Sequence, residues 1–100
     1  MVRWTRSARV ASSGKFFEAI KWAKEIAEFD NKKYKVQVSV YMDSFGELGT
    51  IRWFIDFADL AALEKFMNRV MGDEEHRQKI SPFADLFIQD SVYDTVMQSI

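Results

Sequence analysis

Cysteine is absent from the sequence, and proline and glycine are scarce, with one and four residues among 100. The lack of cysteine excludes disulfides, thiol nucleophiles and zinc–thiolate sites. The scarcity of proline and glycine, together with 48% hydrophobic residues, excludes a disordered or linker-like chain. We therefore expect a single folded domain that covers residues 1–100.

The sequence also lacks an excess of charge of either sign and any long apolar run. Lys and Arg number 14 and Asp and Glu number 15, so we expect no positively charged surface for nucleic acid. No apolar segment approaches the ~20 residues of a transmembrane helix, and MVRWTRSARV has no apolar core of a signal peptide. We expect a soluble, cytoplasmic protein with neither a nucleic-acid nor a membrane partner.

Hydrophobic periodicity predicts six elements in the order strand, helix, strand, strand, helix, strand. Ser12 or Ser13 is expected to cap the first helix, which ends where DNKKY begins, and Asp59 is expected to cap the second. The polar run DEEHRQKI is expected to be a frayed helix end or a loop, before a new helical turn at Ser81–Pro82. The expected strands are 2–10, 35–42, 50–57 and 91–100, and the expected helices are 15–29 and 60–72.

This order of elements predicts a ferredoxin-like β-α-β-β-α-β fold of the α+β class, a four-stranded antiparallel sheet with both helices on one face. In the strand TIRWFIDF, alternation places Ile51, Trp53, Ile55 and Phe57 on the helix-facing side. The opposite face of the sheet mixes polar and aromatic side chains. They are Thr5, Ser7, Gln37, Ser39, Tyr41, Arg52 and Phe54.

Arg6 is a charged residue on the apolar side of its strand. Side chains alternate between the two faces of a strand, so Arg6 shares the helix-facing side with Trp4 and Ala8. An unpaired buried guanidinium costs on the order of several kcal/mol. Arg6 must therefore pair with a carboxylate, reach the rim, turn outward at a bulge, or bind an anion from outside. The last alternative would make Arg6 a ligand site, since arginine suits bidentate carboxylate capture.

Aromatic and apolar residues are expected to share the space between sheet and helices with Arg6. A mostly apolar cleft with one convergent charge is typical of small-molecule sites. Such a cleft would suit a fatty-acid-like ligand, with its tail among the aromatic rings and its carboxylate on Arg6. The predicted ligand-binding residues are Arg6, Trp4, Trp53, Phe66, Met67 and Val70.

His76 is the only histidine and the one candidate for catalysis. Histidine suits general acid–base work near neutral pH, although the polar surroundings DEEHRQK indicate a solvated surface residue. Asp73 and His76 are three residues apart and could chelate a metal on a helix, but two ligands make a poor site. No glycine-rich phosphate loop occurs. We therefore predict neither a metal nor a cofactor.

Three segments, RVASSGKFFEAI, GTIRWFIDFADLAALEKFMNRVMGDEE and SVYDTVMQSI, carry a resemblance to the dimeric α+β barrel superfamily. The first resembles the strand–Gly–helix entry of its antibiotic-biosynthesis-monooxygenase and NIPSNAP-like members. The others resemble the third strand with its following helix, and the closing strand. The resemblance covers nearly the whole chain. It implies a homodimer in which two sheets pack face to face, here through Tyr41, Arg52, Phe54 and their neighbours.

The resemblance leaves the reaction open, because members range from monooxygenases to haem-degrading enzymes. One function is a dimer that binds a small hydrophobic or amphipathic carboxylate in the cleft between sheet and helices. A second is a cofactor-independent or haem-degrading monooxygenase, with Trp53 lining the site and His76 or Arg6 handling the proton or oxyanion. Against haem, the haem-degrading relatives have an asparagine on the first strand where this chain carries Arg6. A third is a structural or interaction module without a ligand.

Overall fold

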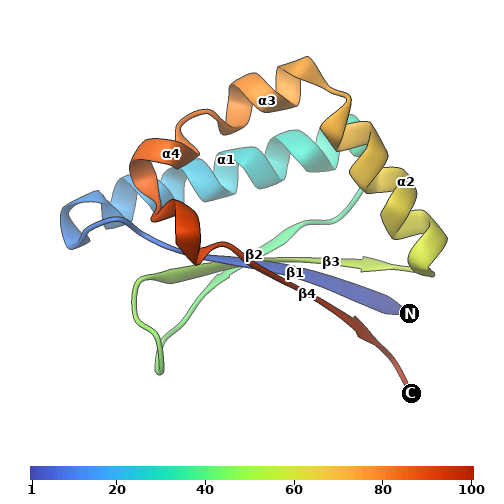
Figure 1. Ribbon diagram of the computed structural model, residues 1–100, viewed down its shortest axis with the longest axis horizontal. Helices are drawn as coiled ribbons and strands as arrows, with labels where there is room; N and C mark the ends of the chain where they lie inside the picture. The colour runs from blue at the N-terminus through green and yellow to red at the C-terminus, as the bar shows by residue number, and fades with distance from the viewer.

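A four-stranded antiparallel sheet carries all the helices on one of its faces in the computed structural model, which describes residues 1–100 (Figure 1). The strand order is β2-β3-β1-β4, so β1 and β3 are central and the last strand lies on the free side of β1. The predicted ferredoxin-like α+β fold is confirmed. The strands are β1 (Val2–Arg9), β2 (Ser39–Met42), β3 (Thr50–Phe57) and β4 (Tyr93–Gln98).

The helical layer contains one long helix and three shorter ones, with two 3-10 turns beside them. The helix α1 crosses the sheet, and α2, α3 and α4 follow one another along it (Figure 1). None of these helices is both long and apolar enough to cross a membrane. The helices are α1 (Phe16–Tyr34), α2 (Leu60–Met71), α3 (Glu74–Ile80) and α4 (Phe83–Leu86), and the 3-10 turns are Ser13–Lys15 and Gln89–Ser91.

The core lies between the sheet and the helices in two clusters. Alanines at positions 19 and 23 of α1 are fully buried, which lets the helix lie close to the sheet. One cluster contains Val2, Trp4, Tyr34, Ile55, Phe57, Leu63 and Phe66, and the other contains Ala8, Ala19, Ala23, Ile51, Trp53, Leu86 and Phe87.

The end of α1 differs from the prediction, because the helix continues through DNKKY to Tyr34. Burial of the Tyr34 ring in the core stabilises the added turns. Lys35 then ends the helix in the left-handed conformation, with φ of 57°. The Asn31 side chain accepts a hydrogen bond from the Val38 amide at 2.7 Å, so residues 35–38 lead into β2 without joining the sheet.

The helix starts and the DEEHRQKI segment give two corrections and one confirmation. The residues after Asp73 in DEEHRQKI form the helix α3, and the Asp73 side chain caps it by accepting a hydrogen bond from the Glu75 amide. The Asp59 cap of α2 is confirmed by its 2.8 Å bond from the Ala62 amide. The serine cap of α1 is wrong, because Ser12 makes no side-chain cap hydrogen bond and α1 follows the turn Ser13–Lys15 directly.

Candidate functional site

A cleft of about 500 Å³ lies between the helix-facing side of the sheet and the helical layer. Seventeen residues line it and twelve of them are hydrophobic, which is the usual make-up of a small-molecule site. All six predicted ligand-binding residues, Trp4, Arg6, Trp53, Phe66, Met67 and Val70, are among them. His76, the candidate for catalysis, also lines the cleft. The sequence analysis missed ten others, namely Trp22, Ile26, Asp30, Val38, Arg77, Ile80, Ser81, Phe83, Ala84 and Val92.

The three tryptophans of the chain all line this cleft, each from a different element. Trp22 of α1 and Trp53 of β3 meet edge to face, with ring centroids 6.2 Å apart. Their indole N–H groups donate to backbone carbonyls, from Trp22 to Lys79 at 3.1 Å and from Trp53 to Ala23 at 3.4 Å. The polar atoms of both rings are thereby satisfied, and the ring faces are free to form apolar walls.

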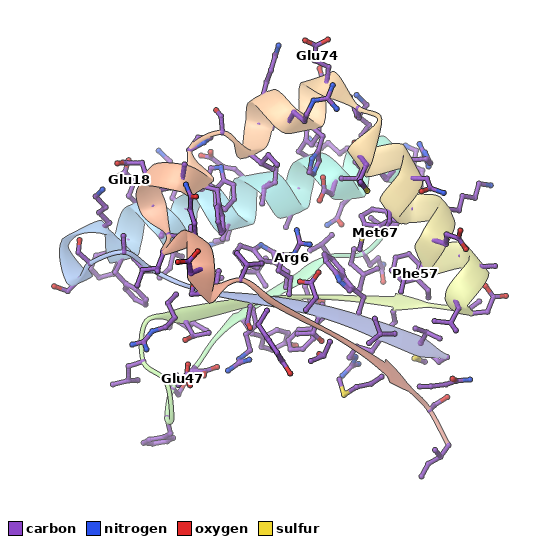
Figure 2. All side chains as sticks on the ribbon, in the orientation of Figure 1. Arg6, Glu18, Glu47, Phe57, Met67 and Glu74 are labelled. Carbon is purple, nitrogen blue, oxygen red and sulfur yellow. The ribbon has the colours of Figure 1, made fainter.

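Arg6 points from β1 toward the helices, as Figure 2 shows. It is paired, because Nε and Nη2 donate to the two carboxylate oxygens of Asp94 on β4, both at 2.8 Å. The guanidinium carbon also lies 5.2 Å from the ring centre of Trp4. The Arg6 side chain is 44% exposed, so the predicted burial is wrong. Among the predicted alternatives, the structure shows the ion pair within the chain.

The ion pair follows from the register of the sheet, which sets Arg6 directly opposite Asp94. Burial tends to raise the pKa of Asp94, but hydrogen bonds from Arg6 and its positive charge outweigh this and hold that pKa below its usual value. Asp94 lies 88 residues from Arg6 in the sequence. Only the pairing of β4 with β1 brings the two together, so alternation along a single strand could not identify the partner.

His76 is buried, which corrects the prediction of a solvated surface residue. It retains 8% of its exposure, because α3 forms and packs its ring against Phe29 and Tyr34, with centroids 6.2 and 6.0 Å away. Its Nε2 lies 3.2 Å from Oδ1 of Asp30 on α1. Asp30 was missed because it begins the DNKKY segment, which the sequence analysis placed outside the helix.

Asp73 does not join His76 in a metal site. Its carboxylate accepts hydrogen bonds from Lys33 Nζ and from the Tyr34 hydroxyl. These two contacts hold the pKa of Asp73 far below its usual range. Burial and the bond to Asp73 raise the pKa of Tyr34. No group of three or more His, Cys, Asp or Glu residues in the chain is placed to hold a metal ion.

The face of the sheet opposite the helices carries the residues predicted to form a dimer. Tyr41 is 60% exposed and meets the Phe54 ring edge to face at 5.2 Å. Arg52 donates to both carboxylate oxygens of Asp43, at 2.8 and 2.9 Å. This open face of the sheet thus combines the exposed ring of Tyr41 and the half-buried ring of Phe54 with charges that are already paired.

The sequence matches no family model and no curated protein, but solved structures share the fold. A NIPSNAP domain protein from Burkholderia xenovorans is 13% identical, with a TM-score of 0.83 over 100% of this chain and 95% of that chain. An antibiotic biosynthesis monooxygenase is 13% identical, with a TM-score of 0.72 over 100% and 99%. A dimeric protein of unknown function with a ferredoxin-like fold from Bacteroides fragilis is 14% identical, with a TM-score of 0.73 over 98% and 95%.

This chain has the ferredoxin-like fold of these proteins. The structural likeness thus confirms the fold that the resemblance in the sequence implies. At such low identity it establishes the fold alone, and the function must be argued from the cleft itself.

Proposed function

We propose that the protein binds a small hydrophobic or amphipathic carboxylate in the cleft between sheet and helices. The observation that carries this proposal is the 500 Å³ cleft, whose mostly apolar lining contains three tryptophans and the guanidinium of Arg6. An apolar tail lies among the indole rings and gains from the removal of its surface from water. The carboxylate lies at Arg6.

Arg6 can bind a ligand carboxylate while it stays paired with Asp94. A guanidinium has five N–H donors, and Asp94 engages one on Nε and one on Nη2. The two hydrogens of Nη1 and the second hydrogen of Nη2 are left to donate. Asp94 also offsets part of the positive charge, which makes the site less attractive to small inorganic anions than a bare arginine would be.

The proposal includes a homodimer formed through the open face of the sheet. The exposed Tyr41 and its neighbour Phe54 are the aromatic residues that interfaces favour. The Bacteroides fragilis structure with the same fold is described as dimeric, which supports the same assembly here. The cleft and this face lie on opposite sides of the sheet, so one surface serves the ligand and the other serves the partner subunit.

Binding is tested with decanoate and decanol, which have the same tail and differ in the charged head. Tryptophan fluorescence reports occupancy directly, because all three tryptophans line the cleft. Arg6→Ala should weaken decanoate binding by about tenfold or more, since a hydrogen bond to a charged group contributes about 1.5–3 kcal/mol. Decanol binding should change little.

Arg3→Ala is the matched control for Arg6→Ala. Arg3 lies on the same strand, is 50% exposed and makes the same bidentate pair with Asp56, at 2.8 and 3.1 Å, but on the other face. It should leave the binding of decanoate unchanged. Equal decanoate affinity in Arg6→Ala and the parent protein would contradict the role of Arg6, and no binding of either probe would contradict the proposal as a whole.

A second candidate is a cofactor-independent monooxygenase that uses the same cleft. It is favoured by the presence of both Trp53 and His76 in the lining and by the fold shared with the antibiotic biosynthesis monooxygenase. The residues do not fit the haem-degrading alternative, because Nε2 of the only histidine faces Asp30 instead of open space. A module without a ligand is disfavoured by the size of the cleft. Turnover of a bound aromatic substrate with uptake of oxygen, measured with an oxygen electrode, tests the second candidate.

A further inference from the structure

His76 and Asp30 form a polar pair in the lining of the cleft that plays no part in carboxylate binding at Arg6. They come from different helices, His76 from α3 and Asp30 from α1. Their side chains are 10% and 14% exposed, and Nε2 lies 3.2 Å from Oδ1. A shielded histidine beside a shielded carboxylate, both bordering an apolar cleft, is an arrangement suited to acid–base chemistry.

The tautomer of the imidazole depends on whether Nε2 donates to Asp30. When Nε2 carries the proton and points it at the carboxylate, Nδ1 keeps a free lone pair and can accept a proton. Oδ1 of Asp30 is buried and has no well-formed hydrogen bond, so the contact is a loose one. Catalytic contacts are often long or poorly aligned before the ligand is bound.

The other polar and charged groups around the pair interact with partners other than Asp30. The Tyr34 hydroxyl and Lys33 are bound to Asp73, and Glu75 pairs with Lys33 as well. Three further cations lie near the pair without contacting the carboxylate of Asp30. Arg77 donates to the Met71 carbonyl, Lys79 lies over the Phe29 ring, and Arg69 lies over the Tyr34 ring.

We infer that His76 and Asp30 are an acid–base dyad that removes a proton from a hydroxyl group of the ligand in the cleft. In the step, the ligand O–H bond breaks, the proton bonds to Nδ1, and the electron pair stays on the ligand oxygen as an oxyanion. The imidazolium formed is paired with Asp30, and no oxidant or reductant is needed. His76 is the catalytic residue and Asp30 the positioning residue.

This inference rests on the proposed function and narrows the ligand class. The hydroxyl must be acidic enough for an imidazole to deprotonate it, which favours an aryl or enol hydroxyl over that of an alkyl alcohol. Aryl groups also suit a lining that contains three indole rings and two phenylalanines, Phe66 and Phe83. The ligand is therefore expected to be a hydrophobic acid that carries an ionisable hydroxyl as well.

The test uses 4-nitrophenol, whose phenolate absorbs at longer wavelength than the phenol, and 4-nitroanisole, which has no proton to lose. Both are titrated into the full-length protein near pH 7, where an ordinary imidazole is mostly neutral, and the spectrum of free nitrophenol at the same pH is subtracted. Binding of 4-nitrophenol to the parent protein should produce the phenolate band. In His76→Gln and in Asp30→Asn, the ratio of bound phenolate to bound phenol should fall by at least one order of magnitude, which corresponds to a pKa change of about one unit in the bound probe.

The control variant is Tyr34→Phe, which removes a hydroxyl beside the same imidazole and should keep the phenolate band. Nitroanisole should bind the parent protein and all variants alike, which shows that the variants are folded and the cleft is intact. Nitroanisole binding without a phenolate band in the parent protein would overturn the dyad alone. Failure of both probes to bind would overturn the dyad and its aryl ligand class. Decanoate binding to the same protein then shows whether the proposed function survives without them.

Discussion

At the scale of single residues, Arg6 and Asp94 together set the charge that the cleft presents to the carboxylate proposed to bind there. The carboxylate of Asp94 already holds one edge of the guanidinium, with two bonds of 2.8 Å. Because the pKa of Asp94 is lowered, this pair stays ionised at neutral pH and down to below the ordinary carboxyl value of about 3.9. Under the proposed function, a ligand carboxylate approaches a guanidinium whose positive charge is partly offset by the negative charge of Asp94.

Asp94→Asn is expected to strengthen decanoate binding several-fold. The substitution removes the negative charge beside the ligand head and frees Nε and Nη2 of Arg6 to form a bidentate pair with the ligand. Decanol binding should stay the same, because its head carries no charge. Tryptophan fluorescence titrations of the two probes measure both effects. Weaker decanoate binding in Asp94→Asn would show instead that Asp94 is needed to hold Arg6 in place.

The residues of the cleft were predictable only where the periodicity within a single strand or helix shows which side chains face the core. Alternation along β1 and β3 identifies Trp4, Arg6 and Trp53, and helical spacing identifies the side of α2 that carries Phe66. The His76–Asp30 pair was not predictable in this way, because it requires α3 to exist and α1 to extend past its expected end. Sequence periodicity identifies the face on which a side chain lies, whereas its partner depends on how the elements pack.

At the scale of elements, the end of α1 and the start of α3 form one joint. Tyr34 ends α1 with its ring in the core, and its hydroxyl bonds Asp73, which caps α3. Lys33 adds an ion pair to the same carboxylate, at 2.7 Å. Long-range contacts at this joint override the local preference of DNKKY and DEEHRQKI for irregular structure, which is why the sequence predicted β3 and α2 closely and this region poorly.

Lys35→Gly is expected to stabilise the fold by up to about 1 kcal/mol, because Lys35 has a left-handed φ of 57° that costs a side-chain-bearing residue energy. Lys21→Gly is the matched control, since Lys21 is exposed on the body of α1 and glycine there should cost about 0.5–1 kcal/mol. Urea denaturation followed by circular dichroism measures both values. Destabilisation by Lys35→Gly would contradict this account of how α1 ends.

At the scale of the whole molecule, the sheet separates the surface proposed to bind the ligand from the surface proposed to form the dimer. The helices cover one face of the sheet and leave the other uncovered (Figure 1). The alternation of β1 places Arg6 toward the cleft and Arg3 on the open face, where it pairs with Asp56 and lies 5.6 Å from the Phe54 ring centre. Arg3 and Arg52 on this face are already paired with Asp56 and Asp43 of the same chain. A dimer formed through the open face would therefore not bury either arginine without a partner.

Phe54→Glu is expected to break the proposed homodimer, because it places a negative charge in the middle of the open face of the sheet, beside Tyr41 and Asp56. Loss of an aromatic anchor at the centre of an interface costs about 2 kcal/mol or more, so the dissociation constant should rise by at least one order of magnitude. Analytical ultracentrifugation over a range of protein concentrations measures it. Phe17→Glu is the control, since Phe17 is 83% exposed but lies on α1, away from that face.

Decanol binding separates loss of the dimer from loss of the fold. The cleft lies on the helix side of the sheet and is lined by residues of a single chain, so a monomeric Phe54→Glu should bind decanol as the parent protein does. A parent protein that sediments as a monomer at every concentration would contradict the dimer. Equal weakening by Phe17→Glu and Phe54→Glu would place the contact on a different surface, because the two residues are carried by α1 and β3.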